Sequence, residues 1–233
     1  MRLPTTLASN IGPLIVPAVF AVMVLTFWSI DSRYLSSANL LNIMNQVSIM
    51  MVVTVAASLV IFTGGFDLSA GAVVALSGVA ASLAIEYTDS VAIALLAGVA
   101  MGMLVGAANG FFVGYCGVSP LIVTLRALNI ARGLALILAG GSAMYNFPTW
   151  FTDLGTSRVL GVPLLFVIAL TVFAVFAVVL RFTTFGVSLY AAGGNAQAAE
   201  LSGINVKFIR FVTYALAGAV TAIAGLMLCA RTG

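Results

Sequence analysis

The sequence contains no histidine and has only two cysteines, Cys116 and Cys229. Their scarcity excludes several kinds of catalytic and metal site, because a Ser-His nucleophile, a His-Glu-x-x-His zinc site and a Cys-x-x-Cys pair all need these residues. We therefore expect no cofactor and no metal. We also expect the two cysteines to be buried free thiols near opposite membrane faces, with no disulfide between them.

Charged residues are also scarce: they make up 6% of the 233 residues, whereas 63% are hydrophobic. A soluble domain has roughly 25% charged residues, so this composition indicates an integral membrane protein with the lipid bilayer as its surroundings. The nine Lys and Arg residues lie mostly near the ends of apolar segments and form no basic patch. We therefore expect no nucleic-acid partner.

Seven apolar segments follow one another along the chain, each near the length of about 20 residues that a membrane-spanning helix needs. They cover residues 13–30, 43–63, 69–86, 91–113, 120–140, 161–180 and 208–229. Because lipid excludes open strand edges, they predict an all-α, polytopic transmembrane helical bundle. The first run is too long for a signal-peptide core and is expected to stay as a membrane helix. No long polar stretch is left, so residues 1–233 predict a single transmembrane domain.

The longest polar loop, 181–210, predicts the orientation of the chain. It carries Arg181, Lys207 and Arg210 against Glu200 alone. Lys and Arg are enriched in cytoplasmic loops, so we expect this loop to be cytoplasmic. Seven spans place the N-terminus, which carries Arg2, on the same side.

The stretch FTGGFDLSAG, residues 62–71, interrupts the apolar pattern. Gly64 and Gly65 predict a broken helix near residues 64–69, and Asp67 or Ser69 is suited to cap the helix that resumes at 68–70. A capped break explains the stretch by itself. A broken helix that lines a solute path and an ion or proton site at Asp67 remain open as alternatives.

Two further patterns concern helix packing and charge within the membrane. Glycines recur every four positions in segment 91–113 and just beyond it, at Gly98, Gly102, Gly106, Gly110 and Gly114. On a helix they form a stripe without side chains, which predicts close packing against another helix. A helix that slides or lines a solute path is the alternative. Arg126 and Arg132 lie within segment 120–140, where an arginine costs about 2.5–3.5 kcal/mol at mid-membrane. They are expected to snorkel, to pair or to face a wet interior.

The cytoplasmic loop contains a candidate short helix at Ala196–Ser202. Asn195 is a good N-cap residue, and Gly203 is a typical helix stop. This helix would expose Ala198, Leu201 and Glu200 to the cytoplasm. A two-turn helix is marginal in water, so we expect it either to dock into a partner's groove or to fold back on its own bundle.

Four stretches together resemble the permease subunit of bacterial ABC importers for monosaccharides of the ribose, xylose, arabinose and galactose type. They are TGGFDLSAGAVVALSG at 63–78, NGFFVGYCGVSPLIVTL at 109–125, ARGLALILAGG at 131–141 and AAGGNAQAAELSGINV at 191–206. The resemblance runs from about Leu41 to the end. It implies an all-helical homodimer in the bacterial inner membrane, two cytoplasmic ATPase subunits and a periplasmic sugar-binding protein.

The resemblance also assigns candidate sites. The ATPase-coupling loop comprises Gly193, Gly194, Asn195, Gln197, Ala198, Ala199, Glu200, Leu201, Ser202 and Gly203. The translocation path or helix break comprises Gly64, Gly65, Asp67, Ser69, Asn109 and Arg132. The sequence has no GxxxxGKS/T motif, so ATP hydrolysis is expected on the partner and not on this chain.

The sequence therefore predicts a non-catalytic permease subunit that passes a pentose or hexose by alternating access. The alternative is an ATPase-independent secondary carrier or channel that uses Asp67 as its ion or proton site. An intramembrane enzyme is disfavoured because the chain has no histidine and no paired carboxylate. Phe66 and Arg126 depart from the usual family pattern. Family members usually continue with further helices, so we expect the chain to lack the last ones.

Overall fold

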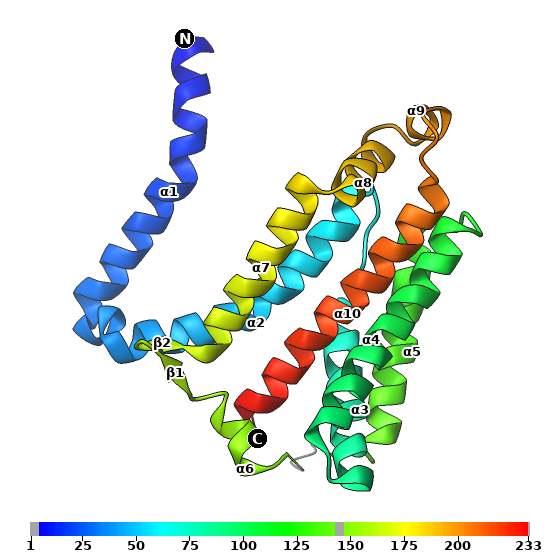
Figure 1. Ribbon diagram of the computed structural model, residues 1–233. Helices are drawn as coiled ribbons and strands as arrows, with labels where there is room; N and C mark the ends of the chain where they lie inside the picture. Colours follow the sequence, from blue (N-terminus) through cyan, green and yellow to red (C-terminus); the bar gives the residue numbers. More distant parts are fainter. Residues whose placement is uncertain (1–4, 143–146, 233) are drawn as a thin grey trace. The chain divides into compact units, whose positions relative to one another are not determined.

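The computed structural model describes residues 5–142 and 147–232 (Figure 1). The chain divides into two compact units, Met1–Met44 and Asn45–Gly233. The first unit contains helix α1 (Thr5–Ile30), the 3-10 turn η1 (Ser32–Leu35) and the start of α2 (Ser37–Phe62). Asp31 ends α1 and caps η1, since its carboxylate accepts a hydrogen bond from the Arg33 N–H at 2.8 Å and pairs with the Arg33 guanidinium at 3.2 Å.

The second unit consists almost entirely of helices. After α2 come α3 (Ala70–Thr88), α4 (Val91–Gly114), α5 (Pro120–Leu138), α6 (Thr149–Asp153), α7 (Leu164–Phe182), α8 (Thr184–Gly194), α9 (Ala196–Leu201) and α10 (Val206–Thr232). The prediction of an all-α polytopic bundle is confirmed: six of the described helices, α2, α3, α4, α5, α7 and α10, are long and apolar enough to cross a membrane.

One short β-hairpin was not predicted. Strand β1 (Arg158–Val159) pairs antiparallel with β2 (Val162–Pro163) before α7 begins. Leu160 and Gly161 form its turn with φ angles of +53° and +84°. Two consecutive left-handed residues suit the twist of a tight hairpin.

Helix α10 is the most buried of these six helices. Its central residues form one apolar cluster with side chains of α2 and α7, including Val52, Val60, Leu165, Tyr214 and Val220. Other faces of α10 lie against α3 and α4. Helix α10, which follows the polar loop, is therefore the central helix of the second unit.

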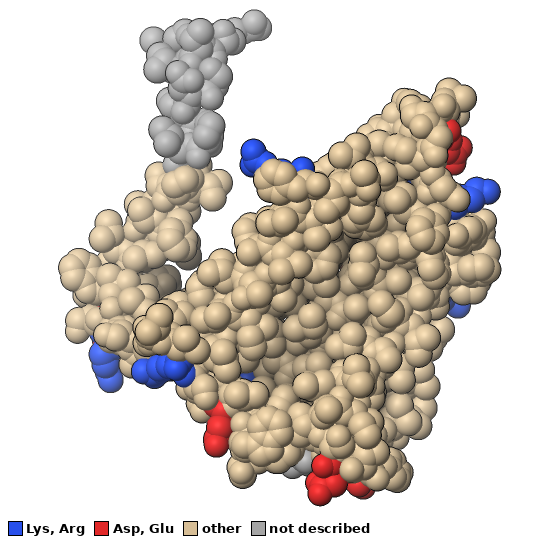
Figure 2. Space-filling model, viewed as in Figure 1, with Lys and Arg blue, Asp and Glu red and all other residues tan. Residues whose placement is uncertain are grey.

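The two ends of the second unit differ in charge. Figure 1 shows α8 and α9 at one end and α6 with the hairpin at the other. The end with α8 and α9 carries Arg181, Lys207, Arg210 and Glu200. Acidic side chains gather near α6 in Figure 2, at the end that carries Glu86, Asp89 and Asp153 together with Arg158 and Arg231.

Both cysteines are free thiols, as expected, but one of the two burial predictions is wrong. Cys229 is partly buried, whereas Cys116 is exposed. Cys116 follows Gly114, the last residue of α4, and therefore lies beyond the packed length of that helix.

Candidate functional site

The predicted helix break is confirmed between Phe62, the end of α2, and Ala70, the start of α3. The last turn of α2 closes on itself, because the N–H groups of Gly64 and Gly65 donate to carbonyl oxygens of Ile61 and Val60. Gly64 has φ +75°, a left-handed conformation that glycine adopts without steric cost. The following residues, 65–69, form an irregular segment that leads to α3.

A chain of polar groups fixes the end of this irregular segment. One carboxylate oxygen of Asp67 accepts hydrogen bonds from the N–H and the hydroxyl of Ser69, at 2.8 and 2.6 Å. The side-chain amide of Asn109 on α4 donates to the Ser69 hydroxyl oxygen at 3.0 Å. Ser69 and Asn109 are buried, and their mutual hydrogen bond satisfies polar groups that burial would otherwise leave unpaired.

The capping prediction for this break is wrong in detail. Ser69 is the N-cap residue of α3 by position, but its side chain makes no capping hydrogen bond. Its hydroxyl donates to Asp67 instead. Asp67 therefore stabilises the turn that leads into the helix and does not bind the free N–H groups of α3.

A residue that the sequence interpretation missed, Tyr214 of α10, holds the middle of the segment. Its side chain is fully buried, and its hydroxyl donates to the carbonyl oxygen of Phe66 at 3.0 Å. A Cβ on Gly65 would lie 2.6 Å from that hydroxyl oxygen. The sequence signal for this role is a tyrosine within an apolar helix, because a buried tyrosine hydroxyl usually has a hydrogen-bond partner.

The short helix of the polar loop forms as α9, and the predicted cap and stop are confirmed. The Asn195 side chain accepts a hydrogen bond from the Ala198 N–H at 3.0 Å, and Gly203 follows with φ +85°. The helix ends at Leu201, one residue before the expected Ser202.

The two faces of α9 have different surroundings. Ala199 is buried in a small cluster with Ala192 and Val206, so one face folds back on the chain's own bundle. Leu201 is 91% exposed. Gln197, Ala198 and Glu200 are exposed as well. The inner face therefore anchors the helix, and the outer face is available to another protein.

The structure brings the end of α8 against the start of the helix break. A Cβ on Gly193 would overlap the carbonyl oxygen of Phe62 and would lie 3.1 Å from the carbonyl carbon of Thr63. A Cβ on Gly64 would in turn lie 3.7 Å from the Gly193 carbonyl oxygen. The two sequence-predicted sites, 64–69 and 193–203, therefore touch backbone to backbone.

The glycine stripe of α4 lies mainly against α10, which runs in the opposite direction. A Cβ on Gly102, Gly110 or Gly114 would lie 2.5, 2.6 or 2.7 Å from a backbone oxygen of α10. These oxygens belong to Gly218, Phe211 and Lys207. Gly106 faces Tyr214, and Gly98 faces Leu226 of α10 and Ser77 of α3.

Arg132 is not brought to the break. It lies on α5 with an exposed side chain, and the hydrogen bonds of the break involve Asp67, Ser69, Asn109 and Tyr214 instead. Arg126, also on α5, lines a groove of about 350 Å³ between α3, α4 and α5. Asn109 lines the same groove.

A smaller cavity of about 180 Å³ adjoins the break itself. Thr63, Gly64, Gly65, Ser119 and Arg210 are among the residues that line it. Within residues 5–142 and 147–232, no group of three or more His, Cys, Asp or Glu side chains is arranged to hold a metal ion. The helix break is therefore a packed, hydrogen-bonded junction between α2 and α3 that α4, α8 and α10 contact.

Comparison with known proteins identifies the family. The model of the permease component of branched-chain amino acid transport systems matches residues 39–233. The chain belongs to this permease family. The matched range begins close to Leu41, where the sequence resemblance began. No solved structure matches the chain.

Several curated relatives are permeases of sugar importers, which confirms the resemblance. The L-arabinose ABC transporter permease protein AraH of Azospirillum brasilense is 36% identical over 91% of this chain and 63% of its own length. The ribose import permease protein RbsC of Bacillus subtilis is 36% identical over 90% and 66%. The D-allose transport system permease protein AlsC of Escherichia coli is 33% identical over 92% and 67%. The chain therefore spans about two thirds of the length of these relatives.

Proposed function

We propose that this chain is the transmembrane permease subunit of an ATP-driven importer that passes a pentose or hexose across the bacterial inner membrane by alternating access. The names of the relatives for arabinose, ribose and allose support the sugar class. The chain itself is a non-catalytic subunit, and ATP is hydrolysed by cytoplasmic ABC ATPase subunits.

The observation that carries this proposal is the exposed helix α9, which follows the end of α8 that touches the helix break. Leu201 projects from a helix that is capped by Asn195 and anchored through Ala199. An exposed leucine on a pre-formed helix suits an apolar groove on a partner. We assign this groove to the ATPase and α9 to the role of the coupling helix.

A movement of α9 would be transmitted to the helix break through two direct contacts. The end of α8 meets α2 at Gly193 and Phe62, and α10 meets the irregular segment 65–69 at Tyr214 and Phe66. Helices α8 and α10 flank α9 in the chain. A shift of α9 on its partner would therefore displace the segment 63–69 from two sides.

The charge distribution supports the orientation. The end with α8 and α9 carries Arg181, Lys207 and Arg210, and an excess of basic residues marks cytoplasmic loops. We place the N-terminus on this side as well. The family resemblance supports a homodimer and a periplasmic sugar-binding protein as further partners.

The proposal is tested by replacing the apolar anchor of α9. The full chain is produced with its cognate ATPase, and retention of the ATPase is measured on the purified complex. Leu201→Asp is expected to weaken binding more than about tenfold, because the loss of a buried apolar anchor costs about 2 kcal/mol. ATP-dependent uptake of labelled arabinose, ribose and allose is measured in parallel.

The matched control is Leu160→Asp in the hairpin turn at the opposite end. Leu160 is 100% exposed, so this variant introduces the same charge without touching α9. Unchanged ATPase retention is expected for it. Equal retention by both variants, or equal loss, would contradict the role given to α9.

A further inference from the structure

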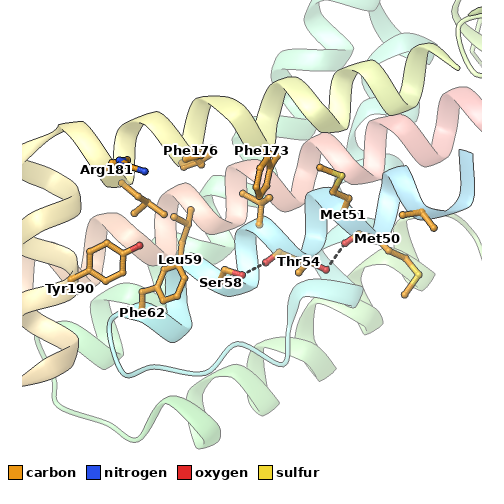
Figure 3. A pocket seen from close by; sticks show the side chains of 14 residues that line it. Met50, Met51, Thr54, Ser58, Leu59, Phe62, Phe173, Phe176, Arg181 and Tyr190 are labelled. Atoms are coloured by element: carbon orange, nitrogen blue, oxygen red, sulfur yellow. Dashed lines mark hydrogen bonds between the residues drawn. The ribbon is translucent and has the colours of Figure 1, made fainter. Parts of the chain in front are cut away.

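A groove of about 920 Å³ lies between α2 and α7; it reaches Phe62, the last residue of α2, but no residue of α9 or of the segment 63–69 lines it (Figure 3). Residues from Val47 to Phe62 of α2 form one wall. The other wall comes from α7, with Phe173, Phe176 and Arg181, and Tyr190 of α8 also lines it. The groove is large enough to hold an extended ligand.

The middle of this groove offers hydrocarbon to a ligand and few free hydrogen-bond donors. The Thr54 hydroxyl donates to the Met50 carbonyl oxygen at 2.8 Å, and the Ser58 hydroxyl donates to the Thr54 carbonyl oxygen at 2.8 Å. Both hydroxyl protons are therefore used within α2 (Figure 3). A sugar would lose its hydrogen bonds to water here without replacement, which is unfavourable. An acyl chain would lose none.

The groove is long enough to hold a lipid chain. From Val47 to Phe62 the wall of α2 extends for about 22 Å at 1.5 Å per residue. One leaflet of a bilayer contributes about 15 Å of hydrocarbon, half of a core of about 30 Å. An acyl chain can therefore lie along α2 and α7 while its headgroup stays at the membrane surface.

One end of the groove is polar and positively charged. Figure 3 shows Arg181 and Tyr190 at the same end, with Met50 and Met51 toward the other. Arg181 is exposed at the end of α7. In the part of the chain that the structure describes, the ion pair is that of Arg33 with Asp31, so no carboxylate neutralises Arg181.

We propose that the groove binds an anionic phospholipid from the leaflet that faces α8 and α9. Its acyl chain lies between α2 and α7, and its phosphate binds the Arg181 guanidinium and the Tyr190 hydroxyl. Basic sites between membrane helices recognise anionic headgroups in this way, and arginine suits phosphate because it donates two parallel hydrogen bonds. The proposal does not rest on the transport role, since neither the segment 63–69 nor α9 lines the groove.

The test measures lipid contact within the groove. The full chain carries Phe176→Trp as the reporter, with Trp28→Phe and Trp150→Phe to remove other signals, and is placed in phosphatidylcholine nanodiscs. Phosphatidylglycerol with brominated acyl chains, which quench tryptophan on contact, is then added in increasing fractions. Quenching is expected to saturate at a lower fraction than for Leu136→Trp, a reporter at an exposed position of α5.

The Arg181→Gln variant is expected to need about five times more phosphatidylglycerol for half-maximal quenching. Arg181→Lys keeps the charge and should largely preserve the preference. Arg132→Gln, which removes an exposed cation from α5, should leave the curve unchanged. The proposal is overturned if brominated phosphatidylcholine quenches equally well or if Arg181→Gln has no effect. Absent quenching together with Ser58→Cys cross-links between two chains would overturn it too, because a second copy would then fill the groove.

Discussion

The hydroxyl of Tyr214 donates a hydrogen bond to the carbonyl oxygen of Phe66 at 3.0 Å, across 148 positions of sequence. This bond joins α10, the most buried of the six long apolar helices, to the irregular segment that separates α2 from α3. Gly65 lies directly beside the hydroxyl, so the segment passes the phenol at close range. The helix break is therefore supported by a residue that lies just after the polar loop 181–210 in sequence.

Removal of this hydroxyl is expected to destabilise the protein. Tyr214→Phe removes the hydrogen bond to the Phe66 carbonyl oxygen, which is partly buried, and this loss costs about 1 kcal/mol. A lower midpoint of thermal unfolding in detergent checks this. Tyr115→Phe is the control, because the Tyr115 side chain is exposed and its ring contacts with Phe111 and Phe211 do not need the hydroxyl. Equal midpoints for the two variants would refute the role of Tyr214.

The glycine stripe of α4 is expected to tolerate no methyl group. In Gly102→Ala the new Cβ would lie 2.5 Å from the Gly218 carbonyl oxygen, so α4 and α10 must separate, at a cost of about 1–3 kcal/mol. Gly133→Ala on α5 meets nothing within 4 Å and should be neutral or stabilising, by up to about 1 kcal/mol. Unfolding midpoints of both variants measure the difference, and a harmless Gly102→Ala would show that the helices are loosely packed.

Two asparagines allow a matched test of helix capping. Asn195 accepts from the Ala198 N–H, and Asn205 accepts from the Phe208 N–H, each at 3.0 Å. Asn195→Ala is expected to cost about 1 kcal/mol and to increase hydrogen exchange throughout α9, which is only six residues long. Asn205→Ala should affect only the first turn of α10, because packing stabilises the rest. Unchanged exchange in α9 would refute the first expectation.

Contact between α8 and the break predicts a difference between two neighbouring glycines. A Cβ on Gly193 meets the Phe62 carbonyl oxygen, whereas a Cβ on Gly194 meets nothing within 4 Å. Gly193→Ala is therefore expected to displace the break and to lower sugar-stimulated ATPase activity of the assembled complex, while Gly194→Ala keeps it. If Gly194→Ala lowers ATPase activity as much as or more than Gly193→Ala, the contact between Gly193 and Phe62 does not take part in coupling.

The Asp67→Asn variant separates the importer from the ATPase-independent carrier. An asparagine side-chain oxygen still accepts from the Ser69 N–H, so the turn is expected to persist and ATP-dependent uptake to continue. The carrier hypothesis requires instead that uptake lose its dependence on an imposed proton gradient. Measurement of sugar uptake in proteoliposomes, with ATP and with a pH gradient in turn, distinguishes the two.

Much of this architecture could be predicted from local patterns. The apolar segments, the break at Gly64 and the capped helix after Asn195 each depend on residues close in sequence, through helix length, glycine conformation and side-chain capping. The resemblance of four sequence stretches was sufficient to identify the family. The exposure of Cys116 was missed because a free cysteine is usually buried, whereas Cys116 lies beyond the end of α4 at Gly114.

Contacts between distant segments were decided only by the tertiary structure. The sequence by itself determined that the chain is a helical membrane protein with a break and a polar loop helix, because solvent and backbone chemistry act locally. It did not determine that Gly193 touches Phe62, that Tyr214 holds Phe66, or that Arg132 stays away from the break. Those outcomes depend on which helix faces pack together, and in lipid such packing follows close backbone approach between small residues rather than a hydrophobic pattern.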